Sequence, residues 1–101
     1  MIKIIEKSGI LPWSIKNIKD ALSKTGVYVL RNDTSVEGII YIGSTNNLER
    51  RLMEHFLSEN IPEVLFFDWY QTSSIENARD LERSWIIKYN PKYNEKINNY
   101  R

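Results

Sequence analysis

One carboxylate of this chain falls where a helix would otherwise be apolar. In a helical projection at about 100° per residue, Glu82 lies within a stripe formed by Ala78, Leu81, Trp85, Ile86 and Tyr89. Burying an ionised carboxylate without a partner is costly, so this position calls for a cation or several hydrogen bonds. The ordinary alternative is a bridge from Arg79, or a place at the edge of the stripe where Glu82 reaches water. Taken alone, the position favours that alternative.

Arg51 and His55 are four residues apart, which places them on one side of a second predicted helix. That side lies beside an apolar stripe of Leu48, Leu52 and Phe56. The two side chains could converge on one phosphate, because arginine offers a fork of donors and histidine transfers protons near neutral pH. A solvated arginine beside a half-buried histidine is, by itself, the commoner arrangement.

Two tyrosines and one asparagine complete the set of candidate residues. Tyr28 and Tyr41 lie on predicted strands, where tyrosine usually packs with its hydroxyl in water. Asn94 follows Pro91 in a segment typical of a turn. The sequence contains no glycine-rich phosphate loop and no serine protease triad that would point to another chemistry.

The elements that would position these residues alternate between helix and strand. Apolar spacing predicts a first helix from about Trp13 to Lys24, then strands at Val27–Arg31 and Ile39–Ile42 joined by a hairpin loop. A second helix is predicted from an Asn46 N-cap to about Asn60, followed by a strand at Val64–Tyr70. A capping box of Ser73 and Glu76 begins the last predicted helix, which runs to about Asn90. The economical arrangement is an α+β fold, a small three-stranded antiparallel sheet flanked by helices.

Composition limits the class of protein. The chain has 101 residues with 42% hydrophobic and 27% charged content, which predicts one domain over residues 1–101. It has no cysteine and lacks an apolar run of the length that spans a bilayer, so we expect a soluble cytoplasmic protein without membrane contact. The net charge of +1 is lower than is usual for a protein that binds nucleic acid tightly on its own.

Several short motifs resemble those of the GIY-YIG nucleases, in the same order. They are Gly26-Val27-Tyr28, then after twelve residues Tyr41-Ile42-Gly43, then Arg51 ten residues after the second tyrosine with His55-Phe56 beyond it, Glu82 after Ala78-Arg79-Asp80-Leu81, and Pro91-Lys92-Tyr93-Asn94. The resemblance covers a motif region at residues 26–94, preceded by an N-terminal helical extension at residues 1–24. Five ordered motifs are more specific than any one of them, and they unite the candidate residues in one site.

The resemblance implies a small three-stranded antiparallel sheet with helices and hydrolysis with a single divalent cation. Glu82 would hold Mg²⁺ or Mn²⁺ mostly through water. Arg51 would stabilise the charge that grows on the phosphate oxygens. Asn94 would order the site rather than react.

The general base stays open between the two tyrosines. An unperturbed tyrosine has a pKa of about 10 and is protonated at neutral pH, so either one needs activation. We favour Tyr41 as the base, with Tyr28 and His55 relaying the proton or positioning the base.

The resemblance implies DNA as the substrate, although RNA stays open, and a protein partner that supplies specificity is compatible with the near-balanced charge. One alternative is a catalytically silent nuclease-like module that binds nucleic acid or protein, which would be free to lose Arg51 or Glu82. Another is a small interaction domain that presents Trp13 and Trp69, which leaves Glu82 unexplained.

Overall fold

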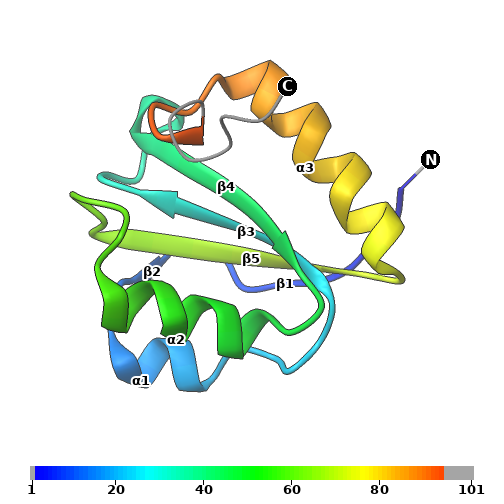
Figure 1. The fold of residues 1–101 in the computed structure, drawn as a ribbon, viewed down its shortest axis with the longest axis horizontal. Helices are drawn as coiled ribbons and strands as arrows, with labels where there is room; N and C mark the ends of the chain where they lie inside the picture. Colours follow the sequence, from blue (N-terminus) through cyan, green and yellow to red (C-terminus); the bar gives the residue numbers. More distant parts are fainter. Residues whose placement is uncertain (1, 95–101) are drawn as a thin grey trace.

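A computed structural model describes residues 2–94, in which an antiparallel sheet carries helices on both faces (Figure 1). In chain order the elements are β1 (Ile4–Lys7), β2 (Leu11–Pro12), α1 (Ile15–Lys19), β3 (Gly26–Arg31), a short 3₁₀ helix η1 (Val36–Gly38), β4 (Ile39–Thr45), α2 (Leu48–Ser58), β5 (Phe66–Thr72) and α3 (Ile75–Tyr89). None of the helices within residues 2–94 has the length and apolar content needed to span a bilayer.

The sheet has five strands, so the prediction of three was wrong in number. Its order is β1-β5-β3-β4, with β2 also paired to β5, and every pairing is antiparallel. The predicted hairpin forms the β3 and β4 pair. The two additional strands are short and mostly exposed. They form by backbone pairing with β5, as between Leu11 and Phe67, and such pairing leaves no alternation of apolar residues in the sequence.

The N-terminal segment predicted as helical therefore also contains strands. Its helix α1 is shorter than predicted and begins after Ser14, whose hydroxyl accepts a hydrogen bond from the Asn17 N–H. Ile18 fixes α1 to the core because its side chain is completely buried. Trp13 packs between the rings of Phe56 and Phe67, with centroid distances of 5.4 and 5.3 Å.

The two faces of the sheet bury separate apolar clusters. Tyr28, Leu30 and Tyr41 face the side covered by α1 and α2, where they join Leu48 and Leu52. Val27, Val29 and Ile42 alternate with them along the strands and face α3, where they form a second cluster with Ile39 and with Ala78 of α3. In Figure 1, α3 lies on the opposite side of the sheet from α1 and α2, and β4 runs along the edge between these helices.

The helix boundaries lie close to the predicted positions, but both predicted N-caps are one residue early. Asn47 caps α2 by accepting from the Arg50 N–H, and Ser74 caps α3 by accepting from the Asn77 N–H. A cap is defined by the side chain that reaches the third N–H of the helix, and neighbouring Asn or Ser residues are hard to distinguish in sequence. Helix α3 ends before Pro91, as predicted.

Candidate active site

Tyr28 and Tyr41 come from the central hairpin and point to the same side of the sheet. Tyr28 pairs with Gly43 across the two strands, and Tyr41 pairs with Leu30. Both tyrosine rings are buried, and their centroids are 6.2 Å apart. A Cβ atom at Gly43 would lie 2.3 Å from the hydroxyl oxygen of Tyr28. Glycine is therefore required at this position for the Tyr28 phenol to lie against β4.

His55 reaches the same place from the last turn of α2. Its ring lies 5.3 Å from that of Tyr28 and 5.5 Å from that of Tyr41, measured between centroids. The Tyr28 hydroxyl and His55 Nε2 are 2.8 Å apart, and His55 Nδ1 lies 2.8 Å from Oδ1 of Asn60. Asn60 is absent from the predicted site because a polar residue just beyond a helix end is ordinary.

Tyr28, Tyr41 and His55 form an aromatic cluster, and burial determines the protonation of Tyr28 and His55. It raises the pKa of the Tyr28 phenol well above its usual value, Tyr41 raises it further, and the guanidinium of Arg51 opposes the rise. Burial also lowers the pKa of His55 below its ordinary value. At neutral pH, Tyr28 is therefore a protonated phenol that faces a neutral imidazole.

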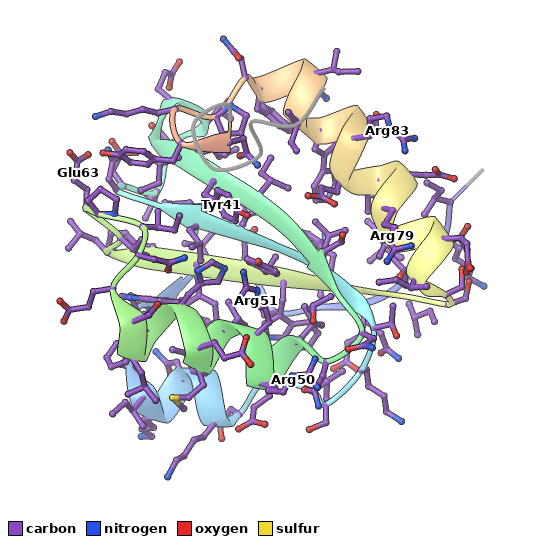
Figure 2. All side chains as sticks on the ribbon, in the orientation of Figure 1. Tyr41, Arg50, Arg51, Glu63, Arg79 and Arg83 are labelled. Carbon is purple, nitrogen blue, oxygen red and sulfur yellow. The ribbon has the colours of Figure 1, made fainter. Side chains whose placement is uncertain are left out.

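Arg51 stands at the rim of the aromatic cluster. Figure 2 shows it extending from α2 toward the sheet, on the side where Tyr41 lies. Its Nη1 donates to Glu54 at 3.0 Å, and its side chain keeps 38% of its surface exposed. The exposed part of the guanidinium is available to an anion, while its charge acts on the Tyr28 phenol. The structure thus brings Arg51 and His55 to one site, as their spacing predicts.

Glu82 approaches from α3, across the edge strand β4. Its Oε1 accepts a hydrogen bond of 2.5 Å from the hydroxyl of Ser44. Within residues 2–94 its carboxylate forms no ion pair, so the bridge from Arg79, one of the two ordinary alternatives, is not formed. Burial raises the pKa of Glu82, and the hydrogen bond from Ser44 opposes the rise. The charge of Glu82 also contributes to the rise in the pKa of Tyr28, less than burial and Tyr41 do.

An open pocket of about 320 Å³ lies beside Glu82. Its lining combines one carboxylate, two guanidinium groups, a hydroxyl and two aliphatic side chains, from Glu82, Arg79, Arg83, Ser44, Ile86 and Ile87. Within residues 2–94 no three His, Asp or Glu side chains are arranged to bind a metal ion together. A half-buried carboxylate without an ion-pair partner nevertheless fits a hard cation that keeps most of its water ligands.

Asn94 lies on the outer edge of β4 rather than among the tyrosines. Its side-chain amide makes two hydrogen bonds to the backbone of Ile42, at 2.8 Å to the carbonyl and 2.9 Å from the N–H. The N–H of Tyr93 also donates to the carbonyl of Ile40 at 2.9 Å. Asn94 therefore fixes the strand that carries Tyr41 and Gly43, and its position supports an ordering role.

A buried ion pair lies elsewhere in the sheet and takes no part in this cluster. Arg31 Nε donates to Asp68 Oδ1 at 2.9 Å, and the hydroxyl of Tyr70 also donates to Asp68. Tyr70 in turn packs edge-on against Trp85 of α3. This network supports the sheet beneath α3, since breaking a buried ion pair is strongly destabilising.

Known proteins are similar to this chain in sequence. The chain is 36% identical over 81 residues to UvrABC system protein C of Pediococcus pentosaceus, covering 73% of this chain and 13% of that protein. It is 35% identical over 78 residues to the protein of the same name from Fervidobacterium nodosum, covering 71% of this chain and 13% of that protein. The chain thus spans only a small part of these relatives.

The solved structures agree with the sequence matches. The magnesium-bound GIY-YIG N-terminal endonuclease domain of UvrC from Thermotoga maritima superimposes with a TM-score of 0.67 and 30% identity, covering 78% of this chain and 92% of that one. The family sequence model for the GIY-YIG catalytic domain matches residues 24–94. These residues contain the tyrosine hairpin, Arg51, Glu82 and Asn94. On this evidence, the chain belongs to the GIY-YIG family of endonuclease domains.

Proposed function

We propose that this domain hydrolyses phosphodiester bonds of DNA with one divalent cation, cutting one strand at each active site. The observation that carries the proposal is the convergence, across β4, of the aromatic cluster, Arg51 and the Glu82 carboxylate. A phosphoryl transfer needs a cationic group for the charged phosphate, a proton acceptor for water and stabilisation of the departing oxygen. The described residues supply the first two and a carboxylate for the third.

Glu82 is the residue proposed to hold Mg²⁺ or Mn²⁺. The similar domain from Thermotoga maritima has magnesium as its catalytic divalent cation. The hydrogen bond from Ser44 orients one carboxylate oxygen of Glu82, and the adjacent pocket has room for water ligands. When bound, such a cation supplies Lewis-acid stabilisation of the oxygen that leaves phosphorus.

The remaining residues act on the phosphate and on the attacking water. The exposed guanidinium of Arg51 binds the phosphate oxygens and stabilises their growing charge. Tyr41 takes the proton from water as it gives up its own phenol proton. Tyr28 and His55 relay that proton to the neutral imidazole or position Tyr41, since the rings of all three are in mutual contact. Asn94 keeps β4 in place by binding the backbone of Ile42.

The substrate and its setting are part of the same proposal. Arg79 and Arg83 belong to α3 (Figure 2). Both line the pocket beside Glu82, which supports contacts to a phosphate backbone. A partner protein would supply specificity, which agrees with the net charge of +1 and with relatives in which the matched region is 13 to 16% of the length. The absence of cysteine supports a cytoplasmic location.

The test is cleavage of labelled supercoiled, linear and branched DNA with Mg²⁺ or Mn²⁺. Wild type is expected to cut, and Glu82→Ala and Arg51→Ala are expected to fail while keeping the wild-type circular dichroism spectrum. Glu76→Ala is the matched control, because Glu76 is an exposed carboxylate in the first turn of α3. If wild type binds DNA but cuts none of these substrates with either metal, the catalytically silent binding module is the better description.

A further inference from the structure

The imidazole of His55 has a hydrogen-bond partner on each ring nitrogen. The ring is almost fully buried and packs between Tyr28 and Tyr41. Nδ1 lies 2.8 Å from the amide oxygen of Asn60, and Nε2 lies 2.8 Å from the hydroxyl of Tyr28. A neutral imidazole has one donor nitrogen and one acceptor nitrogen, so fixing the role of one nitrogen fixes the other.

The amide of Asn60 determines which nitrogen donates. An amide oxygen only accepts hydrogen bonds, so the hydrogen must lie on Nδ1 of His55. The hydroxyl of Ser58 lies 3.1 Å from the same Oδ1 atom and 3.4 Å from the carbonyl oxygen of His55. Its one hydrogen favours the nearer acceptor, which supports the amide orientation that presents oxygen to the ring. Nε2 of a neutral His55 then has a lone pair, and the Tyr28 hydroxyl donates to it.

The backbone explains how Asn60 reaches a ring on the preceding helix. Helix α2 ends at Ser58, and its C-cap residue Glu59 has a left-handed backbone with φ of 53°. The Glu59 N–H donates to the carbonyl of His55 at 2.9 Å, so the chain turns back over the last turn of α2. That turn places Asn60 beside the imidazole.

We propose that Asn60 is a positioning residue that holds His55 as the neutral Nδ1–H tautomer, so that Nε2 accepts the hydrogen of the Tyr28 hydroxyl. The Tyr28 oxygen then presents its lone pairs to the rest of the site, where it can accept a hydrogen from water or from another donor. The consequence for catalysis rests on the proposed nuclease function. The assignment of the tautomer does not rest on that function, because the tautomer is a property of the protein without substrate.

The tautomer can be read directly because His55 is the only histidine of the chain. Protein labelled with ¹⁵N-histidine gives two ring nitrogen signals, and couplings to the ring hydrogens assign them. The spectrum is recorded at pH 8, where burial keeps His55 neutral by lowering its pKa. The expected result is a protonated-type shift for Nδ1 and an unprotonated-type shift for Nε2. The opposite pattern in wild type overturns the proposal.

Two substitutions separate positioning from general support of the fold. Asn60→Ala removes the acceptor and is expected to move the ring signals toward a mixture of tautomers. Asn60→Asp restores an acceptor and is expected to restore the Nδ1–H pattern. Asn77→Ala is the control, because Asn77 lies in the first turn of α3 and bonds to Ser73. If Asn60→Ala keeps the wild-type ring signals, another group holds the tautomer and the proposal is wrong.

Cleavage kinetics test the catalytic consequence. Asn60→Ala is expected to lower kcat by about 10-fold to 100-fold, as when a histidine loses the group that orients it, with KM nearly unchanged. An unchanged kcat in Asn60→Ala contradicts the positioning role. If wild type cuts no DNA, the nuclease proposal fails by itself, and the ring nitrogen spectra still decide whether Asn60 fixes His55.

Discussion

Gly43 lies directly against the phenol of Tyr28, so close that an added Cβ would be 2.3 Å from both the ring and its hydroxyl oxygen. The glycine of the second motif is thus explained by the tyrosine of the first. The two motifs, twelve residues apart in sequence, form one packed pair across the β3 and β4 hairpin.

We predict that Gly43→Ala displaces Tyr28, abolishes cleavage and destabilises the fold by about 1–3 kcal/mol, as overpacking of a core does. Urea denaturation measures the loss of stability. In a Tyr28→Ala background the same substitution should cost much less, because the clashing ring is absent. Equal costs in both backgrounds would show that the ring is not the source of the conflict.

Tyr41→Phe should reduce the cleavage rate by about 10²-fold to 10⁴-fold, which is the usual contribution of a general base. The change retains the ring that packs against Tyr28 and His55, so the thermal stability should remain near wild type. Single-turnover kinetics with Tyr28→Phe alongside compare the two hydroxyls. A near wild-type rate for Tyr41→Phe would transfer the role of base away from Tyr41.

Ser44→Ala should move the acidic limb of the pH-rate profile to higher pH. Burial raises the pKa of Glu82, and the hydrogen bond from Ser44 holds that rise in check. A protonated Glu82 cannot hold a cation, so activity is lost as pH falls through its pKa, and this loss should begin earlier in the variant. Ser84→Ala, an exposed hydroxyl on α3, is the control. Overlapping profiles for wild type and Ser44→Ala would contradict this account.

Glu82→Gln should raise the melting temperature by a few degrees in the absence of metal. Because the pKa of Glu82 is raised in the folded state, the unfolded chain ionises at lower pH, so folding loses stability as pH rises toward that pKa. Calorimetry at pH 7 with EDTA and then with Mg²⁺ measures both effects. Mg²⁺ should stabilise wild type but not the variant, and Glu76→Gln should behave as wild type. A variant that melts below wild type in EDTA would contradict the prediction.

Arg79→Gln and Arg83→Gln should weaken DNA binding and flatten its dependence on salt. Each arginine that neutralises a phosphate contributes about 0.9 to the slope of log K against log salt. Fluorescence anisotropy with labelled DNA and no divalent metal gives that slope. Lys16→Gln and Lys19→Gln remove the same charge from α1, on the other side of the sheet. Equal losses in both pairs would mean that only net charge matters.

The sequence predicts best those features that depend on local spacing. The hairpin of Tyr28 and Tyr41, the shared side of Arg51 and His55, and the half-buried carboxylate of Glu82 each follow from a strand or helix repeat. The motif order adds the family, which the comparisons confirm.

The features that the sequence does not predict depend on contacts between distant segments or on a backbone conformation that no local pattern indicates. Ser44 and Glu82 are 38 residues apart in the chain, and a serine at a strand end gives no sign of its partner. Asn60 reaches His55 through a left-handed residue that is not glycine. Strands β1 and β2 form because β5 offers a free backbone edge. Their side chains are mostly exposed, so no apolar alternation in the sequence indicates the pairing.

The two hydrogen bonds between the Asn94 amide and the backbone of Ile42 have a consequence for association with other chains. An edge strand with unpaired backbone groups is a template for strand addition by another chain. On β4 the backbone groups of Ile42 are occupied by the Asn94 amide, and the carbonyl of Ile40 by Tyr93. The middle of β4, beside Tyr41, therefore offers none of these groups to the backbone of an added strand, and the residues that order the site also oppose edge-to-edge association there.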